Sequence, residues 1–87
     1  SAASDVYKRQ SQLTPTEYDL LRVLVANAGQ VMTHRQLLRQ VWGPGYENDA
    51  HLLRVNISNL RRKVEDPDPE APRLIRPDPG VGYRITD

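Results

Sequence analysis

The sequence predicts a single α+β domain in which three helices precede a C-terminal β-hairpin. Three observations predict this fold: a helix-start pattern at Thr14 and again at Thr33, an amphipathic stretch at residues 50–64, and two partly alternating apolar runs around a Pro-Gly turn at residues 77–80. A chain of 87 residues has room for one small domain with a modest core.

Each of the first two helices begins with a capping box, in which an N-cap threonine and a glutamate or glutamine three residues later bond each other's backbone N–H groups. Thr14 and Glu17 form the first box, with Pro15 at the first helical position, and Thr33 and Gln36 form the second. The inward faces are expected to carry Leu20, Leu21, Leu24, Val25 and Ala28 in the first helix and Leu37, Leu38, Val41 and Trp42 in the second.

Glycines are expected to end both helices. Gly29 suits the left-handed position after the first helix, and Gly43, Pro44 and Gly45 break the second. Residues 30–32 are expected to form a short extended link, and Asp49 is the expected N-cap of the third helix.

The third helix, residues 50–64, has two faces of different chemistry. An apolar stripe at helical spacing consists of Leu53, Ile57, Leu60 and Val64. The opposite face carries His51, Val55, Ser58, Asn59 and Arg62, with Arg54 and Arg61 on one edge and Lys63 on the other. A helix that buries one face and presents hydrogen-bonding and cationic side chains on the other fits a DNA major groove, although the pattern alone equally fits a solvated surface helix.

A hairpin is expected after the third helix. The prolines of residues 65–72 stop the helix, and strands are predicted at residues 73–76 and 82–86 around the turn at 77–80. Two helices joined by a loop, the second basic on its outer face, followed by a hairpin wing, make a winged helix-turn-helix. Trp42 and Tyr83 are expected in the core rather than stacked on bases.

Charge is distributed unevenly along the chain. The net charge is only +1, but residues 34–63 hold six Lys or Arg against two acidic residues, and four acidic residues follow at 65–70. This middle segment suits a polyanionic partner. No apolar run is long enough to span a membrane and no secretory signal is evident, so we expect a cytoplasmic protein without a membrane partner.

The domain is expected to occupy residues 13–87. Residues 1–12 are polar and without period, and SAASDVYKRQ resembles a translated sequencing adaptor, which predicts a disordered or non-native lead-in. The absence of an initiating Met predicts a fragment of a longer protein.

Catalytic chemistry finds little support. His34 and His51 are the only histidines, there is no cysteine to share a metal site, and Ser58 has no base partner in the sequence. The glycines of GVGYR follow a turn and precede a strand, so they do not form a nucleotide loop. We expect no enzyme, no cofactor and no metal.

Each nucleic-acid candidate has a simpler structural alternative. Asn56 and Asn59 can pair with adenine and Val55 can contact a thymine methyl, but asparagine is also a common surface residue. Arg62 suits a base edge or a phosphate, or else is a solvated cation near Glu65 or Asp66. The helix start at residues 33–35 favours a phosphate through its N–H groups, or is a plain cap.

Four blocks in order, LTPTEYDLL, VMTHRQLLRQVWG, LRVNISNLRRKVE and GVGYRI, resemble the C-terminal winged-helix effector domain of OmpR/PhoB-type response regulators over residues 13–86. The block VWGPGY and the helix after it are most similar to the Kdp-type, potassium-uptake branch. The resemblance implies a two-component transcription factor whose receiver domain, absent from this fragment, is phosphorylated by a sensor kinase. Homodimers of such regulators bind direct repeats in promoters.

The resemblance also implies roles for particular residues. Groove-facing positions of the family correspond to His51, Val55, Asn56, Ser58, Asn59 and Arg61. Combined with the helix periodicity, the expected base-facing set is His51, Val55, Asn56, Ser58, Asn59 and Arg62, and the expected phosphate contacts are Thr33, His34, Arg35, Arg54, Arg61, Lys63, Arg76 and Arg84. The loop of residues 42–49 corresponds to a segment that contacts RNA polymerase, with Tyr46 and Glu47 as candidates.

Two features depart from the family pattern. The small sheet that normally precedes the first helix is expected to be largely missing, because only about a dozen residues precede Thr14. The wing tip carries Pro77, Asp78 and Pro79 where relatives have a Thr and an Arg, so minor-groove binding by the tip is not expected, and Arg76 and Arg84 remain to approach the DNA backbone.

The function expected from these observations is sequence-specific binding of double-stranded DNA to control transcription. The alternative is a winged helix that binds a protein partner and no DNA, an idea favoured by the apolar Val55 and the acidic wing tip.

Overall fold

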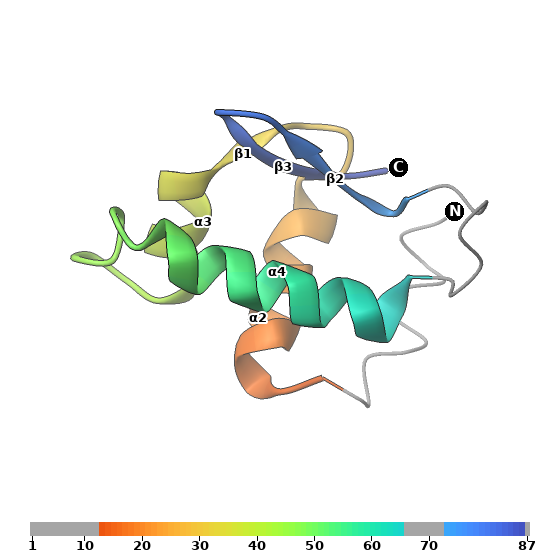
Figure 1. The fold of residues 1–87 in the computed structure, drawn as a ribbon, viewed down its shortest axis with the longest axis horizontal. Coiled ribbons are helices and arrows are strands. Elements are labelled where there is room, and N and C mark those ends of the chain that lie inside the picture. Colours follow the sequence, from red (N-terminus) through yellow and green to blue (C-terminus); the bar gives the residue numbers. More distant parts are fainter. Residues whose placement is uncertain (1–12, 66–72, 87) are drawn as a thin grey trace.

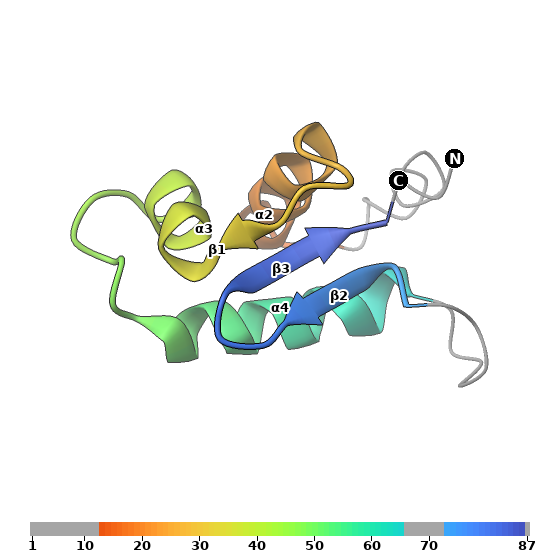
Figure 2. The same cartoon turned by 90° about the horizontal axis from the view of Figure 1, so that it is seen from above.

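A computed structural model describes residues 13–65 and 73–86. It contains, in order, α2 (Pro15–Ala26), β1 (Met32–Thr33), α3 (His34–Val41), α4 (Ala50–Val64), β2 (Ile75–Asp78) and β3 (Gly82–Ile85). Helix α4 runs across one side of the molecule and α2 and α3 lie behind it (Figure 1). Seen from above, the sheet lies over the space between α4 and the α2–α3 pair, with β2 next to α4 (Figure 2). This is the three-helix domain with a C-terminal hairpin that the sequence predicts.

Both predicted capping boxes are confirmed. The Glu17 N–H donates to Thr14 Oγ1 at 3.2 Å, and Glu17 Oε1 accepts from the Thr14 N–H at 3.0 Å. The same two bonds join Thr33 and Gln36 at 3.0 and 2.9 Å. Gly29 has the predicted left-handed backbone, with φ of 84°, but α2 ends earlier, at Ala26. The N–H of Gly29 instead reaches the carbonyl of Ile85 on β3.

The sheet corrects two of the predicted boundaries. Met32 was expected in an extended link and Thr33 only as a helix N-cap, but together they form β1. This strand pairs antiparallel with β3, in a sheet of order β1-β3-β2. Strand β2 begins two residues later than predicted and includes Pro77. Because β2 is an edge strand, the missing N–H of Pro77 is tolerated there.

Gly82 allows β1 and β3 to approach closely. A Cβ added at this residue would lie 1.8 Å from the carbonyl oxygen of Met32, well inside any real contact. The pairing of Thr33 with Gly82 therefore requires glycine, and this pairing holds the start of α3 against the hairpin.

The core is formed by one face of each helix and the inner face of the sheet. Its buried members are Leu20, Leu21, Val23, Leu24, Met32, Leu37, Leu38, Leu53, Ile57, Leu60, Val64, Ile75, Tyr83 and Ile85. Val23 was not predicted, whereas Val25, Ala28, Val41 and Trp42 are only partly buried against this cluster. The core location of Tyr83 is confirmed at 8% exposure.

None of the helices among the described residues is long and apolar enough to cross a membrane. The predictions for the lead-in at residues 1–12, for the missing N-terminal sheet and for most of the acidic Pro-rich segment fall outside the residues that the structure describes.

Candidate nucleic-acid interface

Helix α4 presents a shallow concavity on its outer face. Asp49 caps the helix as predicted, because its side chain accepts the N–H of Leu52 at 3.3 Å. The apolar stripe is confirmed in the core, which turns the opposite face to solvent. The concavity is lined by His51, Arg54, Val55, Ser58, Asn59 and Arg62.

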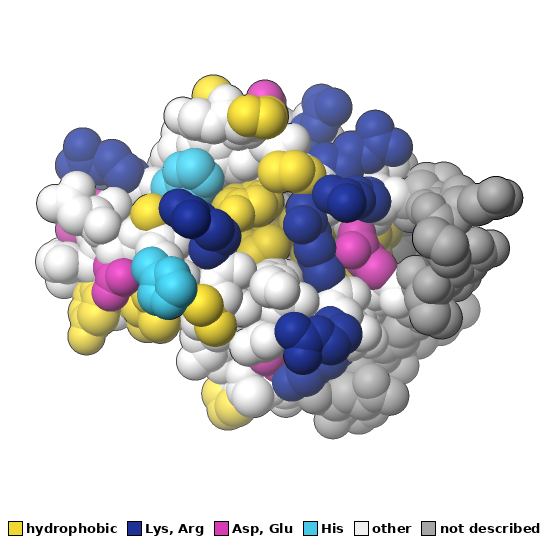
Figure 3. Space-filling view, in the orientation of Figure 1, with side chains coloured by type: hydrophobic (Ala, Val, Ile, Leu, Met, Phe, Trp, Pro, Cys, Tyr) yellow, Lys and Arg dark blue, Asp and Glu magenta, His cyan; other side chains and the backbone are white. Residues whose placement is uncertain are grey.

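This surface combines cationic, hydrogen-bonding and apolar groups. Lys, Arg and His side chains are spread over the face that α4 presents (Figure 3). Within residues 13–65 and 73–86, no carboxylate pairs with Arg54 or Arg62, and both side chains are exposed. Val55 is 42% exposed in the middle of this polar surface. The concavity can therefore attract phosphates and present donors, acceptors and one apolar contact to a base edge.

Asn56 does not line the concavity. It is half-buried, and its side-chain amide donates to the carbonyl of Leu52 one turn earlier, at 2.9 Å. Five of the six residues expected to face bases therefore lie together, and Asn56 lies toward the buried side of the helix.

Arg61 faces the hairpin instead of the outer surface. Its Nε and Nη2 donate to the carbonyl oxygen of Ile75 at 3.1 and 2.8 Å, and Nε lies 3.9 Å from Glu65 Oε2. The guanidinium also lies 6.0 Å from the centre of the Tyr83 ring. Glu65 Oε1 in turn accepts the N–H groups of Leu74 and Ile75 at 2.6 and 2.9 Å. Arg61, which was predicted to contact a DNA phosphate, therefore joins the end of α4 to the start of β2 in this structure.

Lys63 is likewise engaged within the domain. Its Nζ lies 2.6 Å from Oε1 of Glu17, which is 3% exposed at the start of α2. Burial by itself raises the pKa of Glu17, but hydrogen bonds from Lys63 and the Thr14 N–H, with the attraction of the ammonium, outweigh it and lower that pKa below its ordinary value. The sequence indicated Glu17 only as part of a cap.

The start of α3 lies beside the hairpin turn. The His34 N–H donates to the carbonyl of Val81 at 3.2 Å, and the His34 ring meets Tyr83 edge-on with 5.5 Å between ring centres. Thr33 is occupied by its capping box, whereas the Arg35 side chain is exposed. Of the three residues predicted here to bind phosphate, Arg35 is the one with an exposed charge.

The loop between α3 and α4 has a defined turn. Glu47 Oε2 accepts the Gly45 N–H at 2.8 Å, and Tyr46 is 46% exposed. Hydrogen bonds from the backbone N–H groups of Glu47 and Gly45, together with the positive charges of Arg39 and Arg35, lower the pKa of Glu47 below its ordinary value. The two predicted polymerase contacts are thus a surface tyrosine and an ionised glutamate.

The hairpin carries its cations at mid-strand rather than at the tip. Arg76 and Arg84 are exposed and lie opposite each other in the β2–β3 register. Gly80, with φ of 77°, forms the turn, and Asp78 at the end of β2 is half-buried. The acidic, proline-containing tip therefore offers no cation within the described turn.

Comparison with known proteins identifies relatives over most of the chain. Residues 8–85 match the family described as "Transcriptional regulatory protein, C terminal". The KDP operon transcriptional regulatory protein KdpE of Escherichia coli K12 is 48% identical over 78 residues, which cover 90% of this chain and 34% of KdpE. The chain thus spans about a third of the length of this relative.

Two solved structures support the same assignment. The DNA-binding domain of E. coli CadC matches with a TM-score of 0.75 and 30% identity, covering 85% of this chain and 68% of that chain. The Klebsiella pneumoniae RstA DNA-binding domain, solved in complex with the RstA box, matches with a TM-score of 0.73 and 31% identity, covering 85% and 72%. The predicted resemblance to OmpR/PhoB-type effector domains is confirmed, and the chain belongs to the family of C-terminal domains of transcriptional regulatory proteins.

Proposed function

We propose that this domain binds double-stranded DNA in a sequence-specific manner, with the outer face of α4 in the major groove, and so controls transcription. The observation that carries the proposal is the concavity of α4, where Arg54 and Arg62 have no carboxylate partner among the described residues and lie beside Asn59 and Val55. Guanidinium, amide and apolar groups are those that distinguish base pairs in the major groove.

Phosphate contacts would position the helix on the duplex. Arg54 lies on the concavity and Arg35 at the start of α3, on elements joined by the short loop before α4. Arg61 and Lys63 are engaged by Ile75 and Glu17, so we assign them to fixing the angle of α4 rather than to direct contacts. Positioning by phosphates and selection by base edges are separable contributions in such interfaces.

The larger protein would be a two-component response regulator of the Kdp-type branch, because residues 8–85 match a C-terminal domain family and the chain spans about a third of the length of a KdpE relative. In that protein, a sensor kinase would phosphorylate a receiver domain, and homodimers would bind direct repeats in promoters. The whole protein would be cytoplasmic. Tyr46 and Glu47 would contact RNA polymerase, since their loop leaves the tyrosine ring exposed.

The alternative of a protein-binding winged helix rests on the exposure of Val55, and one titration separates the two functions. A fluorescent duplex is titrated with the 87-residue chain at about 50 and about 200 mM salt, and anisotropy is measured. DNA binding predicts a measurable affinity at low salt and a steep fall of that affinity at high salt, because binding releases counterions that are condensed on the duplex. No binding at low salt would favour the protein-binding function.

A further inference from the structure

Two arginines stand side by side on the outer surface of the hairpin. Arg76 of β2 and Arg84 of β3 are cross-strand partners, and both are exposed. In the part of the chain that the structure describes, neither guanidinium forms an ion pair, and Arg76 makes only a 3.4 Å hydrogen bond from Nε to the carbonyl of Arg73. Like charges directly opposite each other in an antiparallel pair repel and destabilise the pairing. Because neither guanidinium has an ion-pair partner among the described residues, the two arginines leave a positive potential on this surface.

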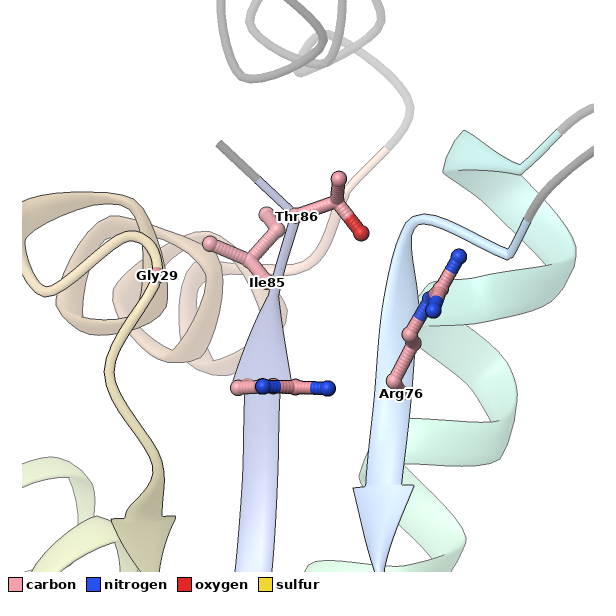
Figure 4. A pocket seen from close by; sticks show the side chains of 5 residues that line it. Gly29, Arg76, Ile85 and Thr86 are labelled. Carbon is pink, nitrogen blue, oxygen red and sulfur yellow. The ribbon is translucent and has the colours of Figure 1, made fainter.

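The same two arginines line a small pocket at the base of the hairpin. Gly29, Ile85 and Thr86 complete its wall, and its volume is about 200 Å³. Figure 4 shows Gly29 and Arg76 on opposite sides of the end of β3, where Ile85 and Thr86 lie. This volume is below that of pockets for drug-sized ligands, so the pocket suits a small ion or a single chemical group.

Three other donors of the wall are already bonded within the protein. The Gly29 N–H donates to the carbonyl of Ile85, the Thr86 N–H donates to Leu74, and the Thr86 hydroxyl donates to the carbonyl of Arg73. The guanidiniums are the cationic donors that the wall offers to a ligand. Arginine forks match the spacing of oxygens in phosphate groups.

We propose that Arg76 and Arg84 jointly bind one phosphate group at the base of the hairpin. The site shares no lining residue with the concavity of α4. The phosphate has two sources: inorganic phosphate, or a backbone phosphate of DNA, in which case this use of the site rests on the proposed function. Because both cations hold the same group, the two side chains act as one unit rather than as two separate contacts.

The existence of the site is tested without DNA. The ¹⁵N-labelled 87-residue chain is titrated with inorganic phosphate, and with sodium chloride at matched ionic strength, while NMR shifts are followed. Saturable shifts are expected at Gly29, Thr86 and the two arginine Nε groups with phosphate alone. Arg76→Gln or Arg84→Gln should weaken binding about tenfold, as loss of a charge-assisted bond predicts.

Arg22→Gln is the matched control, because Arg22 is an exposed cation on α2 that does not line the pocket and is paired with Asp19. It should leave phosphate binding unchanged. Equal shifts with chloride, or phosphate binding that survives in the Arg76→Gln/Arg84→Gln double variant, would overturn the site.

The source of the phosphate is tested by duplex anisotropy on the same variants. If the pair holds one DNA phosphate, each single substitution weakens binding to every duplex, and the double variant loses less than the sum of both. Fully additive losses would overturn joint binding to DNA. Unchanged DNA affinity together with lost phosphate binding supports the site with inorganic phosphate as its ligand. Failure of the unsubstituted chain to bind any duplex would instead overturn the proposed function, and the phosphate titration alone would then decide the site.

Discussion

The guanidinium of Arg61 donates two hydrogen bonds to the carbonyl oxygen of Ile75, and so joins the last turns of α4 to the first residue of β2. Arg62, the next residue, is exposed on the outer face and has no such partner among the described residues. Adjacent arginines on one helix therefore have different roles, one in orienting the hairpin against α4 and the other at the surface proposed to bind DNA.

Arg61→Lys should destabilise the domain although it keeps the charge. A lysine cannot direct two donors of a rigid planar group at one carbonyl oxygen, and Ile75 is fully buried, so its carbonyl would lose at least one of its two donors. We expect a loss of about 1–3 kcal/mol in the free energy of unfolding by urea denaturation. Arg62→Lys is the matched control and should change it by less than about 0.5 kcal/mol. Equal effects of the two substitutions would refute the assignment.

Lys63→Ala should make stability depend differently on pH. In the folded domain the pKa of Glu17 is lowered from 4.5, so its ion pair contributes stability above that value and loses it as pH falls through the folded-state pKa. Without the ammonium, burial dominates and the pKa of Glu17 rises. The variant should be less stable by about 1–3 kcal/mol near pH 7, a discounted range because Lys63 is partly exposed.

The deficit of Lys63→Ala should shrink in acid, because a protonated Glu17 no longer needs a cation. Urea denaturation across the pH range measures this. Arg22→Ala, which removes the exposed pair with Asp19, serves as the control and should lose less than about 1 kcal/mol. A deficit that stays constant down to about pH 3 would show that the ion pair contributes nothing and only packing was lost.

Gly82→Ala should prevent stable folding. The Cβ of the alanine would lie 1.8 Å from the Met32 carbonyl oxygen, so β1 and β3 must separate. We expect the free energy of unfolding to fall by more than about 4 kcal/mol. Gly80→Ala tests backbone conformation without a clash, because Gly80 has φ of 77° and nothing within 4 Å of an added Cβ. It should cost only about 1–2 kcal/mol. Thermal unfolding followed by circular dichroism separates the two, and similar losses would mean that the close approach is not required.

Arg35→Ala should weaken binding to all duplexes alike. The side chain is exposed at the start of α3, where a cation meets phosphates and carries no base information. We expect the slope of log affinity against log salt to flatten by about one unit. Anisotropy titrations with specific and random duplexes over a salt series measure this, and a loss restricted to the specific site would argue against a phosphate contact.

Local patterns in the sequence predicted the elements whose determinants lie within a few residues. The capping boxes depend on residues three apart, and the buried stripe of α4 depends on helical period, so Thr14, Thr33 and Leu53 were placed correctly. Strand β1 was missed because two residues beside a helix cap show no alternation. The edge strand β2 was shifted by two residues because Pro77 and Asp78 were assigned to the turn, although an edge strand tolerates a proline.

The partners of the charged residues could not be predicted in the same way. Lys63 meets Glu17 across 46 positions of sequence and Arg61 meets Ile75 across 14. Periodicity places both cations on the edges of the outer face, and only the packing of α4 against α2 and the hairpin decides that they turn inward. The residues without long-range partners, including Asn59 and Arg62, remained where the helix period placed them.

The most direct test of the proposed interface compares two asparagines of α4. A specific duplex is first obtained by selection from a random library, and affinities for it and for random DNA are measured by anisotropy. Asn59→Ala should lose about 1–3 kcal/mol of binding free energy on the specific duplex and none on random DNA, because the substitution removes an amide from the outer concavity. Asn56→Ala, whose amide bonds to Leu52 instead, should keep its preference for the specific duplex. An equal loss on both duplexes for Asn59→Ala would contradict base recognition by this face of α4.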